Sequence, residues 1–156
     1  MNQRRATQFC AEPYRRSPWT LRCPTRRPAL RRTGYLHHPD TGTLHLTRQY
    51  GLTDQLATCY AAVRPGQPTA CATAAATGRP VIIDEITRSP IFAGQPILDV
   101  MRDAGVRAVH SHPLRHDAGH LLGELSFHYR TTNLRRGDSE LVAWCAARAL
   151  TRTARP

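Results

Sequence analysis

The sequence predicts an α+β fold in which helices cover a central antiparallel sheet. Pairs of strands joined by short turns lie near both ends of the patterned region, and short turns join antiparallel strands. Short helical segments separate the two pairs, which favours helices laid over one sheet. The chain has 156 residues, 40% hydrophobic and 21% charged, as is typical of a single globular domain.

The first pair of strands comprises residues 35–37 and 43–47. Between them, Pro39-Asp40-Thr41-Gly42 combines the residue types that favour tight turns. We therefore expect a hairpin to open the domain.

Two helices and a strand are predicted next. Residues 54–63 have the pattern of a short helix that ends before Pro65. Residues 69–77 are rich in Ala and are followed by Gly78, which indicates a small-residue helix packed closely on a neighbour. Residues 80–86 are rich in β-branched side chains and predict a strand.

A helix, two long strands and a last helix are predicted in the second half. A helix over residues 96–104 has Pro in its first turn and Gly just past its end. Residues 106–114 and 120–130 predict two long strands, and a last helix begins at Asp138 or Ser139. We expect the buried stripe of this helix to be Leu141, Trp144, Cys145 and Ala149. The predicted order is β-β-α-α-β-α-β-β-α.

The net charge of +11 is concentrated in the N-terminal segment. All 22 basic residues are Arg, and nine of them fall between Arg4 and Arg32 beside one acid, Glu12. We therefore expect residues 1–33 to form a disordered Arg- and Pro-rich tail, 34–150 the domain, and 151–156 a short C-terminal tail. The tail is interpreted as a linker, with a nucleic-acid-binding arm over residues 1–32 as the alternative.

The five Cys residues show no C-x-x-C pair, and their odd number does not suit a closed set of disulfides. Free thiols in a reducing compartment are expected. The first thirty residues lack the apolar stretch of a signal peptide, and no apolar run approaches the length of a transmembrane helix. These features predict a cytoplasmic protein.

Four of the eight His residues fall within residues 110–120. His110 and His112 would share one face of a strand and are weak candidates for a zinc site. The tetrapeptide His-Ser-His-Pro also resembles the zinc motif of JAMM-type isopeptidases. The Ser-x-x-Asp that completes this motif is replaced by His120 and Gly123, so no metal site is predicted.

No catalytic group is identified. Ser111 and Ser126 lie within predicted strands and outside any Gly-x-Ser-x-Gly elbow. Cys71 begins a helix, where the helix dipole can lower a thiol pKa, but no base is identifiable nearby. The adjacent acids Asp84 and Glu85 would point to opposite faces of a strand. The sequence therefore predicts a non-enzymatic protein.

Five short motifs follow one another along the chain. They are Gly78-Arg79-Pro80-Val81, Pro90-Ile91-Phe92, Ala104-Gly105-Val106-Arg107-Ala108, Ser111-His112-Pro113-Leu114 and Leu121-Leu122-Gly123-Glu124-Leu125-Ser126. Together they resemble the GAF domains of bacterial sensor proteins, over about residues 35–150. The resemblance implies a GAF/PAS-like fold with a central antiparallel sheet of five or six strands, helices on both faces and a small-molecule pocket on one side.

The resemblance also implies which residues line that pocket. The candidates are Cys71, Ala75, Phe92, Leu98, Met101, Val109, Ser111, Leu125 and Phe127, and the alternative is that these residues are simply core. No cofactor is identified. No Cys is followed by His, so covalent bilin attachment is not supported, and the Asn-Lys-Phe-Asp-Glu signature of cyclic-nucleotide-binding members is not found.

The family normally begins with an amphipathic helix that packs beside the last helix, and here the Arg-rich tail holds that place. One face of the sheet is therefore expected to be partly bare, and we predict self-association as a homodimer or binding to a signalling partner. Because only residues 151–156 follow the last helix, the module is expected to act through a partner or to derive from a longer sensor.

The leading hypothesis is a non-enzymatic sensory or regulatory module that binds a small molecule or a signalling protein. The first alternative is an enzyme on the same scaffold, such as a methionine-sulfoxide reductase that uses Cys71 or Cys59. The second is a nucleic-acid-binding arm on a dimerising domain.

Overall fold

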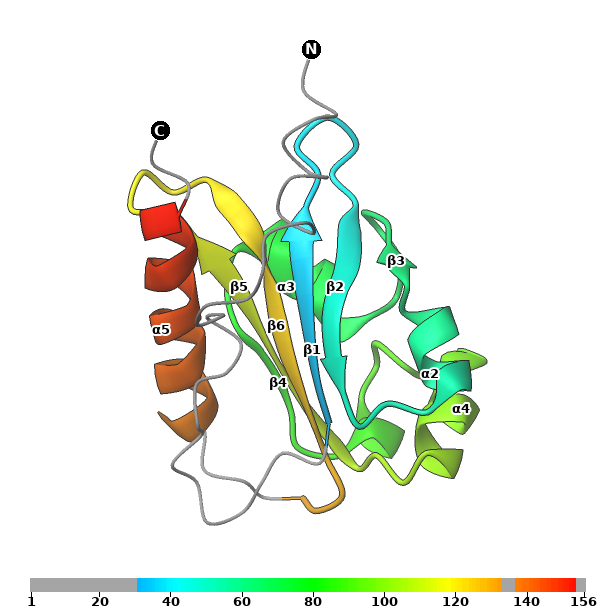
Figure 1. Cartoon of the computed structure of the whole chain (residues 1–156). Coiled ribbons are helices and arrows are strands. Elements are labelled where there is room, and N and C mark those ends of the chain that lie inside the picture. Colours follow the sequence, from blue (N-terminus) through cyan, green and yellow to red (C-terminus); the bar gives the residue numbers. More distant parts are fainter. Residues whose placement is uncertain (1–30, 133–136, 154–156) are drawn as a thin grey trace.

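The computed structural model describes residues 31–132 and 137–153 (Figure 1). Within them a six-stranded antiparallel sheet has the strand order β3-β2-β1-β6-β5-β4. In chain order the elements are β1 (Arg31–His37), β2 (Leu44–Tyr50), α2 (Asp54–Cys59), β3 (Ala62–Val63), α3 (Ala70–Thr77), β4 (Val81–Ile83), the short 3₁₀ helix η2 (Ile86–Arg88), α4 (Ile97–Asp103), β5 (Ala108–Arg115), β6 (Leu121–Tyr129) and α5 (Gly137–Thr153). The expected α+β class, with an antiparallel sheet of five or six strands, is confirmed.

The pleat of the strands divides the buried side chains between two cores. The first core lies between the sheet and helices α2, α3 and α4, and it includes Tyr35 and Val109. The second core lies between β5, β6 and α5, and it includes Leu114 and Phe127. Figure 1 shows α5 on one side of the sheet and α3 behind it. Both faces of the two long strands are therefore covered, which alternation alone does not show.

Glycine is required where β1 and β6 approach each other. Gly123 pairs with Leu36, and a Cβ built on Gly123 would stand only 2.0 Å from the carbonyl oxygen of Tyr35. Any larger residue at this position would push the two central strands apart. The Leu-Leu-Gly motif thus has a packing reason.

The helix expected over residues 54–63 is shorter, because the chain leaves it to extend the sheet. Thr53 caps α2 by accepting a hydrogen bond from the backbone amide of Leu56, and the helix ends at Cys59. Ala62 and Val63 then pair with the edge of β2 as β3, opposite His45 and Leu44. This pairing buries Val63 and satisfies backbone groups that a longer helix would leave open.

Helix α3 confirms the prediction for residues 69–77. The Thr69 hydroxyl accepts a hydrogen bond from the amide of Ala72, and Gly78 ends the helix in the left-handed conformation at φ 67°. Its Ala-rich face packs on the sheet, as small side chains allow. The strand expected over residues 80–86 covers only Val81–Ile83, and Ile86–Arg88 turns into η2 because the Glu85 side chain caps that turn.

The stripe expected on the last helix is wrong by about one position. Leu141 and Trp144 are 54% and 59% exposed. The side chains that face the sheet are instead Val142, Ala143, Ala146 and Leu150. Small residues at this interface bring α5 close to the strands, whereas Trp144 stays outside and lies beneath the guanidinium of Arg148, 5.0 Å from its ring centre.

Strand β1 starts at Arg31 and includes Arg32 and Thr33, three residues that the sequence prediction had assigned to the tail. The Arg31 side chain is buried and donates to the carbonyl oxygens of Gly51 and Ala104. The rest of the predicted tail, residues 1–30, lies outside the described residues, and so does the predicted arm apart from its last two residues. No helix in the described part of the chain is long and apolar enough to cross a membrane.

Candidate functional site

A pocket opens between α2, the start of α3 and the start of α4, and we call it the α2–α4 pocket. Its volume is about 290 Å³, and its lining includes Tyr60, Val63, Gln67, Thr69, Ile97 and Val100. This volume is near the lower end of the range usual for small-molecule sites, about 300–1,000 Å³. The walls are mainly apolar, with a few hydrogen-bonding groups, as is typical of such sites.

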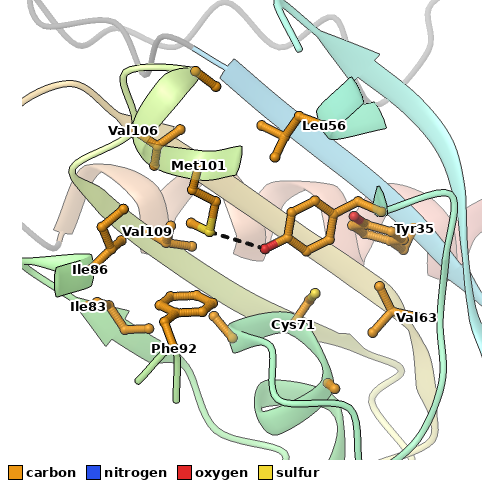
Figure 2. Packing of buried hydrophobic residues seen from close by; sticks show 14 of the residues in the cluster. Tyr35, Leu56, Val63, Cys71, Ile83, Ile86, Phe92, Met101, Val106 and Val109 are labelled. Atoms are coloured by element: carbon orange, nitrogen blue, oxygen red, sulfur yellow. Dashed lines mark hydrogen bonds between the residues drawn. The ribbon is translucent and has the colours of Figure 1, made fainter. Parts of the chain in front are cut away.

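Tyr60 forms the boundary between this pocket and the first core. Its hydroxyl donates to the thioether sulfur of Met101 at 3.4 Å, the contact drawn as a dashed line in Figure 2. Its ring meets the ring of His128 edge-on, with centres 6.1 Å apart. A thioether is a weak acceptor, so the hydroxyl is held less firmly than an oxygen acceptor would hold it. Tyr60 thus links α2 to α4 through a weak bond.

Most of the pocket candidates from the sequence lie together in the first core. Cys71, Phe92, Met101 and Val109 are buried there and surround a common centre (Figure 2). Ala75 and Leu98 pack against this cluster. None of these residues lines the α2–α4 pocket, but Tyr60 and Val63 belong both to its lining and to the first core.

The structure corrects the prediction that Leu125 and Phe127 line the pocket. Both belong to the second core, beneath α5, and so lie on the opposite face of the sheet from Tyr35. The prediction correctly placed the apolar residues of β6 on one face but assigned that face to the pocket. The residues of β6 that face the first core alternate with them and are polar: Glu124, Ser126 and His128.

Two of these side chains form a hydrogen-bonded chain with Ser111 of β5. We call this chain the inner polar row: Ser111, Ser126 and Glu124. Ser111 is the one polar pocket candidate from the sequence, and its hydroxyl lies 2.7 Å from that of Ser126. Ser126 donates to Glu124 Oε1, also at 2.7 Å. All three side chains are buried. Glu124 Oε2 has no hydrogen-bond partner among the described residues.

Burial governs the charge of Glu124. Removal from water raises the pKa of this carboxyl to about 8, and the smaller effects of the Ser126 and Ser111 hydroxyls and the His112 backbone lower it. Glu124 is therefore mainly protonated at neutral pH. A buried carboxyl without a cationic partner is ordinarily neutral for this reason.

His128 continues the same face of β6 toward its end. Its Nε2 lies 3.5 Å from the Thr33 hydroxyl, and its Nδ1 has no partner among the described residues. Burial lowers the pKa of His128 to about 4, and the charge of Arg31 adds to this effect. The imidazole is therefore neutral at physiological pH.

Cys71 has the properties of a buried core thiol. Its Sγ–H donates to the Thr69 hydroxyl at 3.4 Å. Burial, followed by the proximity of Glu124, raises the pKa of Cys71 to about 12. A thiolate nucleophile needs the opposite shift. Cys59 is exposed at the rim of the pocket, in the lining but outside the core.

His110 and His112 share one strand face, as the sequence predicted, and that face is the one covered by α5. Their ring centres are 6.5 Å apart, and His110 Nδ1 lies 3.0 Å from the hydroxyl of Ser139 on α5. Burial, with a smaller effect of His110, lowers the pKa of His112 to about 4. Within residues 31–132 and 137–153 no group of three or more His, Cys, Asp or Glu side chains converges as a metal site would require.

Sequence reasoning missed Glu124, Tyr60 and Thr69 as site residues. The alternation of polar residues at 124, 126 and 128 could have indicated Glu124, but the same pattern is typical of a strand with one face in water. Tyr60 was placed inside a helix, where it had no distinctive role. Thr69 was recognised only as part of a helix.

The fold has the α+β architecture shared by GAF and PAS domains. It combines a six-stranded antiparallel sheet, helices on both faces and the α2–α4 pocket. The model of the GAF domain family matches residues 25–150, and the chain belongs to that family. No curated protein matches the chain.

Solved structures with this fold come from several kinds of protein. One is the GAF domain region of a membrane protein from Geobacter sulfurreducens PCA (15% identity, TM-score 0.64, 79% of each chain covered). Another is a domain of a protein described as a two-component sensor histidine kinase from Sinorhizobium meliloti 1021 (19% identity, TM-score 0.59, 80% of each chain). A third is the type II free methionine-R-sulfoxide reductase of Thermoplasma acidophilum (16% identity, TM-score 0.60, 80% of this chain and 79% of that chain). At these identities the likeness shows the fold.

Proposed function

We propose that this chain is a sensory or regulatory GAF module that binds a small molecule in the α2–α4 pocket. The observation that carries the proposal is an open, mainly apolar pocket of about 290 Å³ whose lining residue Tyr60 also belongs to the first core and interacts electrostatically with buried Glu124. Glu124 Oε2 has no hydrogen-bond partner among the described residues, and stable cores leave few buried polar atoms without partners. A ligand that reaches this core gains a hydrogen bond there.

The pocket is also placed where binding can move helices. It lies between α2, α3 and α4, and the weak Tyr60–Met101 bond joins two of these helices. A ligand that separates α2 from α4 changes the position of short surface helices without disrupting the sheet. Such a displacement is the kind of change that a partner protein can detect.

The alternative of a Cys-dependent reductase is not favoured by the described thiols. A reductase on this scaffold would need an accessible cysteine with a lowered pKa. Cys71 is buried and its pKa is raised to about 12, whereas Cys59 lies exposed on the rim. The structural likeness to the Thermoplasma acidophilum reductase, at 16% identity, therefore supports the fold alone.

A ligand-binding screen with a pocket-filled variant tests the proposal. Ile97→Trp places an indole in the pocket lining, and Leu141→Trp adds the same group on the exposed side of α5 as the matched control. We expect fragments that bind the wild-type protein, detected by ligand-observed NMR, to bind the Leu141 variant and to lose binding to the Ile97 variant. Fragments that bind all three proteins equally, or no binder in a library of several hundred, would contradict the proposal.

Self-association remains a separate hypothesis for how the module passes on its signal. Trp144 and Leu141 stand exposed on α5, and Tyr50 is 64% exposed on β2. Exposed large apolar side chains are frequent at protein interfaces. We expect light scattering at high concentration to show dimers that Trp144→Ala weakens, and a strictly monomeric protein would argue against this route.

A further inference from the structure

The inner polar row ends in a hydrogen-bonding group that the fold leaves unused. Ser126 donates to Glu124 Oε1, and Glu124 Oε2 has no partner among the described residues although the side chain is 0% exposed. Leaving a buried polar atom without a bond is costly. Tyr60, which lines the α2–α4 pocket, interacts electrostatically with Glu124 from within the first core. The unmade bond of Oε2 therefore indicates a place for a ligand atom that reaches the core past Tyr60.

The protonation of Glu124 indicates which kind of hydrogen-bonding partner Oε2 needs. A carboxyl buried among apolar side chains is more stable when neutral, and a neutral carboxyl carries one proton. Because Oε1 already accepts from Ser126, the proton belongs on Oε2. Oε2 is therefore a donor without an acceptor.

The groups that face Glu124 from neighbouring elements are neutral as well. They are Tyr35 on β1, Tyr60 after α2 and Cys71 on α3, and the pKa of each is raised mainly by burial. Each supplies an O–H or S–H donor, and the Tyr60 hydroxyl has only a thioether as acceptor. The region thus has a surplus of donors and no net charge.

Arg31 is a buried cation on the neighbouring strand β1, and it acts on His128 at the far end of this face. Its guanidinium lowers the pKa of His128 and already donates to two backbone carbonyls. It is therefore committed to structure and does not provide a counter-ion for an anionic ligand at Glu124. An anionic ligand would enter without a partner, and a cationic ligand would bind only at the cost of ionising Glu124 in the core.

Resting on the proposed function, we propose that Glu124 forms the polar end of the ligand site. Its Oε2 donates a hydrogen bond to an acceptor oxygen of an uncharged ligand of the ketone, ester or amide class. The ligand enters through the α2–α4 pocket, and Tyr60 gives up its weak bond to Met101 and moves aside, because it stands between the pocket and the first core. The apolar body of the ligand then lies among Val63, Ile97 and Val100.

Three probes of nearly equal size separate the alternatives: acetophenone, which is neutral with one acceptor oxygen, benzamidine, which is a cation, and benzoate, which is an anion. Each is titrated into the full chain by NMR at pH 6.5 and pH 9.0, and circular dichroism confirms that the protein is folded at both. We expect acetophenone to bind most tightly. Its Kd should rise ~10-fold at pH 9.0, because ionised Glu124 loses the donated proton.

Two substitutions assign the effect to Glu124. Glu124→Gln keeps a donor of the same shape, so it should bind acetophenone at both pH values without the ~10-fold change. Glu124→Leu removes the donor and should bind acetophenone at least ~10-fold more weakly at pH 6.5, the equivalent of one hydrogen bond of about 1.4 kcal/mol. Both side chains are neutral. Because Glu124→Leu removes the acceptor of the buried Ser126 hydroxyl, circular dichroism confirms that this variant is folded before its binding is measured.

Each other outcome overturns a defined part of the account. Tighter binding of benzamidine, with affinity that increases with pH, would show that ionised Glu124 accepts from a cation and would refute the ligand class. Acetophenone binding that is lost in Ile97→Trp but unchanged in Glu124→Leu would refute the role of Glu124 and leave the proposed function standing. If none of the three probes binds the wild-type protein at concentrations on the order of 10 mM, this inference is refuted. Binding of fragments of other kinds would still support the proposed function.

Discussion

Replacing Glu124 by Gln is expected to change how the stability of the protein depends on pH. The pKa of Glu124 in the folded protein is raised from 4.5 to about 8, mainly by burial. In the unfolded chain the carboxyl returns to its ordinary pKa. Between these two values unfolding releases a proton, so the free energy of unfolding falls as pH rises.

The size of the effect follows from the two pKa values. Each unit of pKa difference corresponds to about 1.4 kcal/mol, so the free energy of unfolding falls by on the order of 5 kcal/mol between pH 4.5 and pH 8. Below pH 4.5 both states hold the proton and the contribution of Glu124 is constant. Above pH 8 both states have lost it, and the contribution is constant again at its least favourable value. Gln has no such proton, so the variant lacks this decrease.

Urea unfolding at pH 5.0, 6.5, 8.0 and 9.0, followed by far-UV circular dichroism, measures the difference between the two proteins. Buried His112 and His128 affect both proteins equally, so their contribution cancels in the difference. We expect Glu124→Gln to become progressively more stable than wild type as pH rises, by several kcal/mol at pH 8. Stability curves that run parallel across this range would show that Glu124 is solvated or paired, and would refute the reasoning.

The remaining predictions address the histidines, the thiols and the core. Replacing His128 by Phe should reduce the loss of stability between pH 6.5 and pH 4. The pKa of His128 is lowered to about 4 in the folded protein, so protonation of the unfolded chain lowers the free energy of unfolding by on the order of 3 kcal/mol as pH falls through this window. The same loss of stability at acid pH in both proteins would contradict this prediction. A thiol reagent at pH 8 should modify exposed Cys59 readily and buried Cys71 only on unfolding, as mass spectrometry of the labelled peptides would show; equal labelling would disprove the burial of Cys71. Phe92→Ala should lower the free energy of unfolding by about 3–5 kcal/mol, because this side chain is fully buried. Trp144→Ala, at an exposed position, should change it by less than about 1 kcal/mol. Similar losses for the two variants in urea unfolding would show that the two side chains are buried alike.

Much of the fold could be predicted because the signals were local. The Pro-Asp-Thr-Gly turn, the Ala-rich segment closed by Gly78 and the alternation in residues 121–129 each specify a structure within a few residues. The short strand Ala62–Val63 could not be predicted, because it exists only through pairing with the distant edge of β2. The boundary at Arg31 was missed for a similar reason, since pairing with β6 and a buried guanidinium hold this residue in the sheet.

The candidate site was predicted less well, because its chemistry depends on which helices cover each face of a strand. Leu125 and Phe127 are apolar and buried, yet α5 covers them, and the pocket side of the same strand carries Glu124 and Ser126. Alternation gives two faces but does not assign them to particular helices. The error on α5 has a related cause, since the packing of Ala143 and Ala146 on the strands outweighs the larger apolar area of Trp144.

Mapping a binder by ¹H–¹⁵N NMR would test the central claim, that the α2–α4 pocket is a small-molecule site, most directly. A fragment that binds the wild-type protein and not Ile97→Trp would be titrated into labelled protein. The account predicts shift changes centred on the amides of Tyr60, Thr69 and Val100, which line the pocket. Shift changes centred instead on Leu141 and Trp144, on the exposed side of α5, would contradict it.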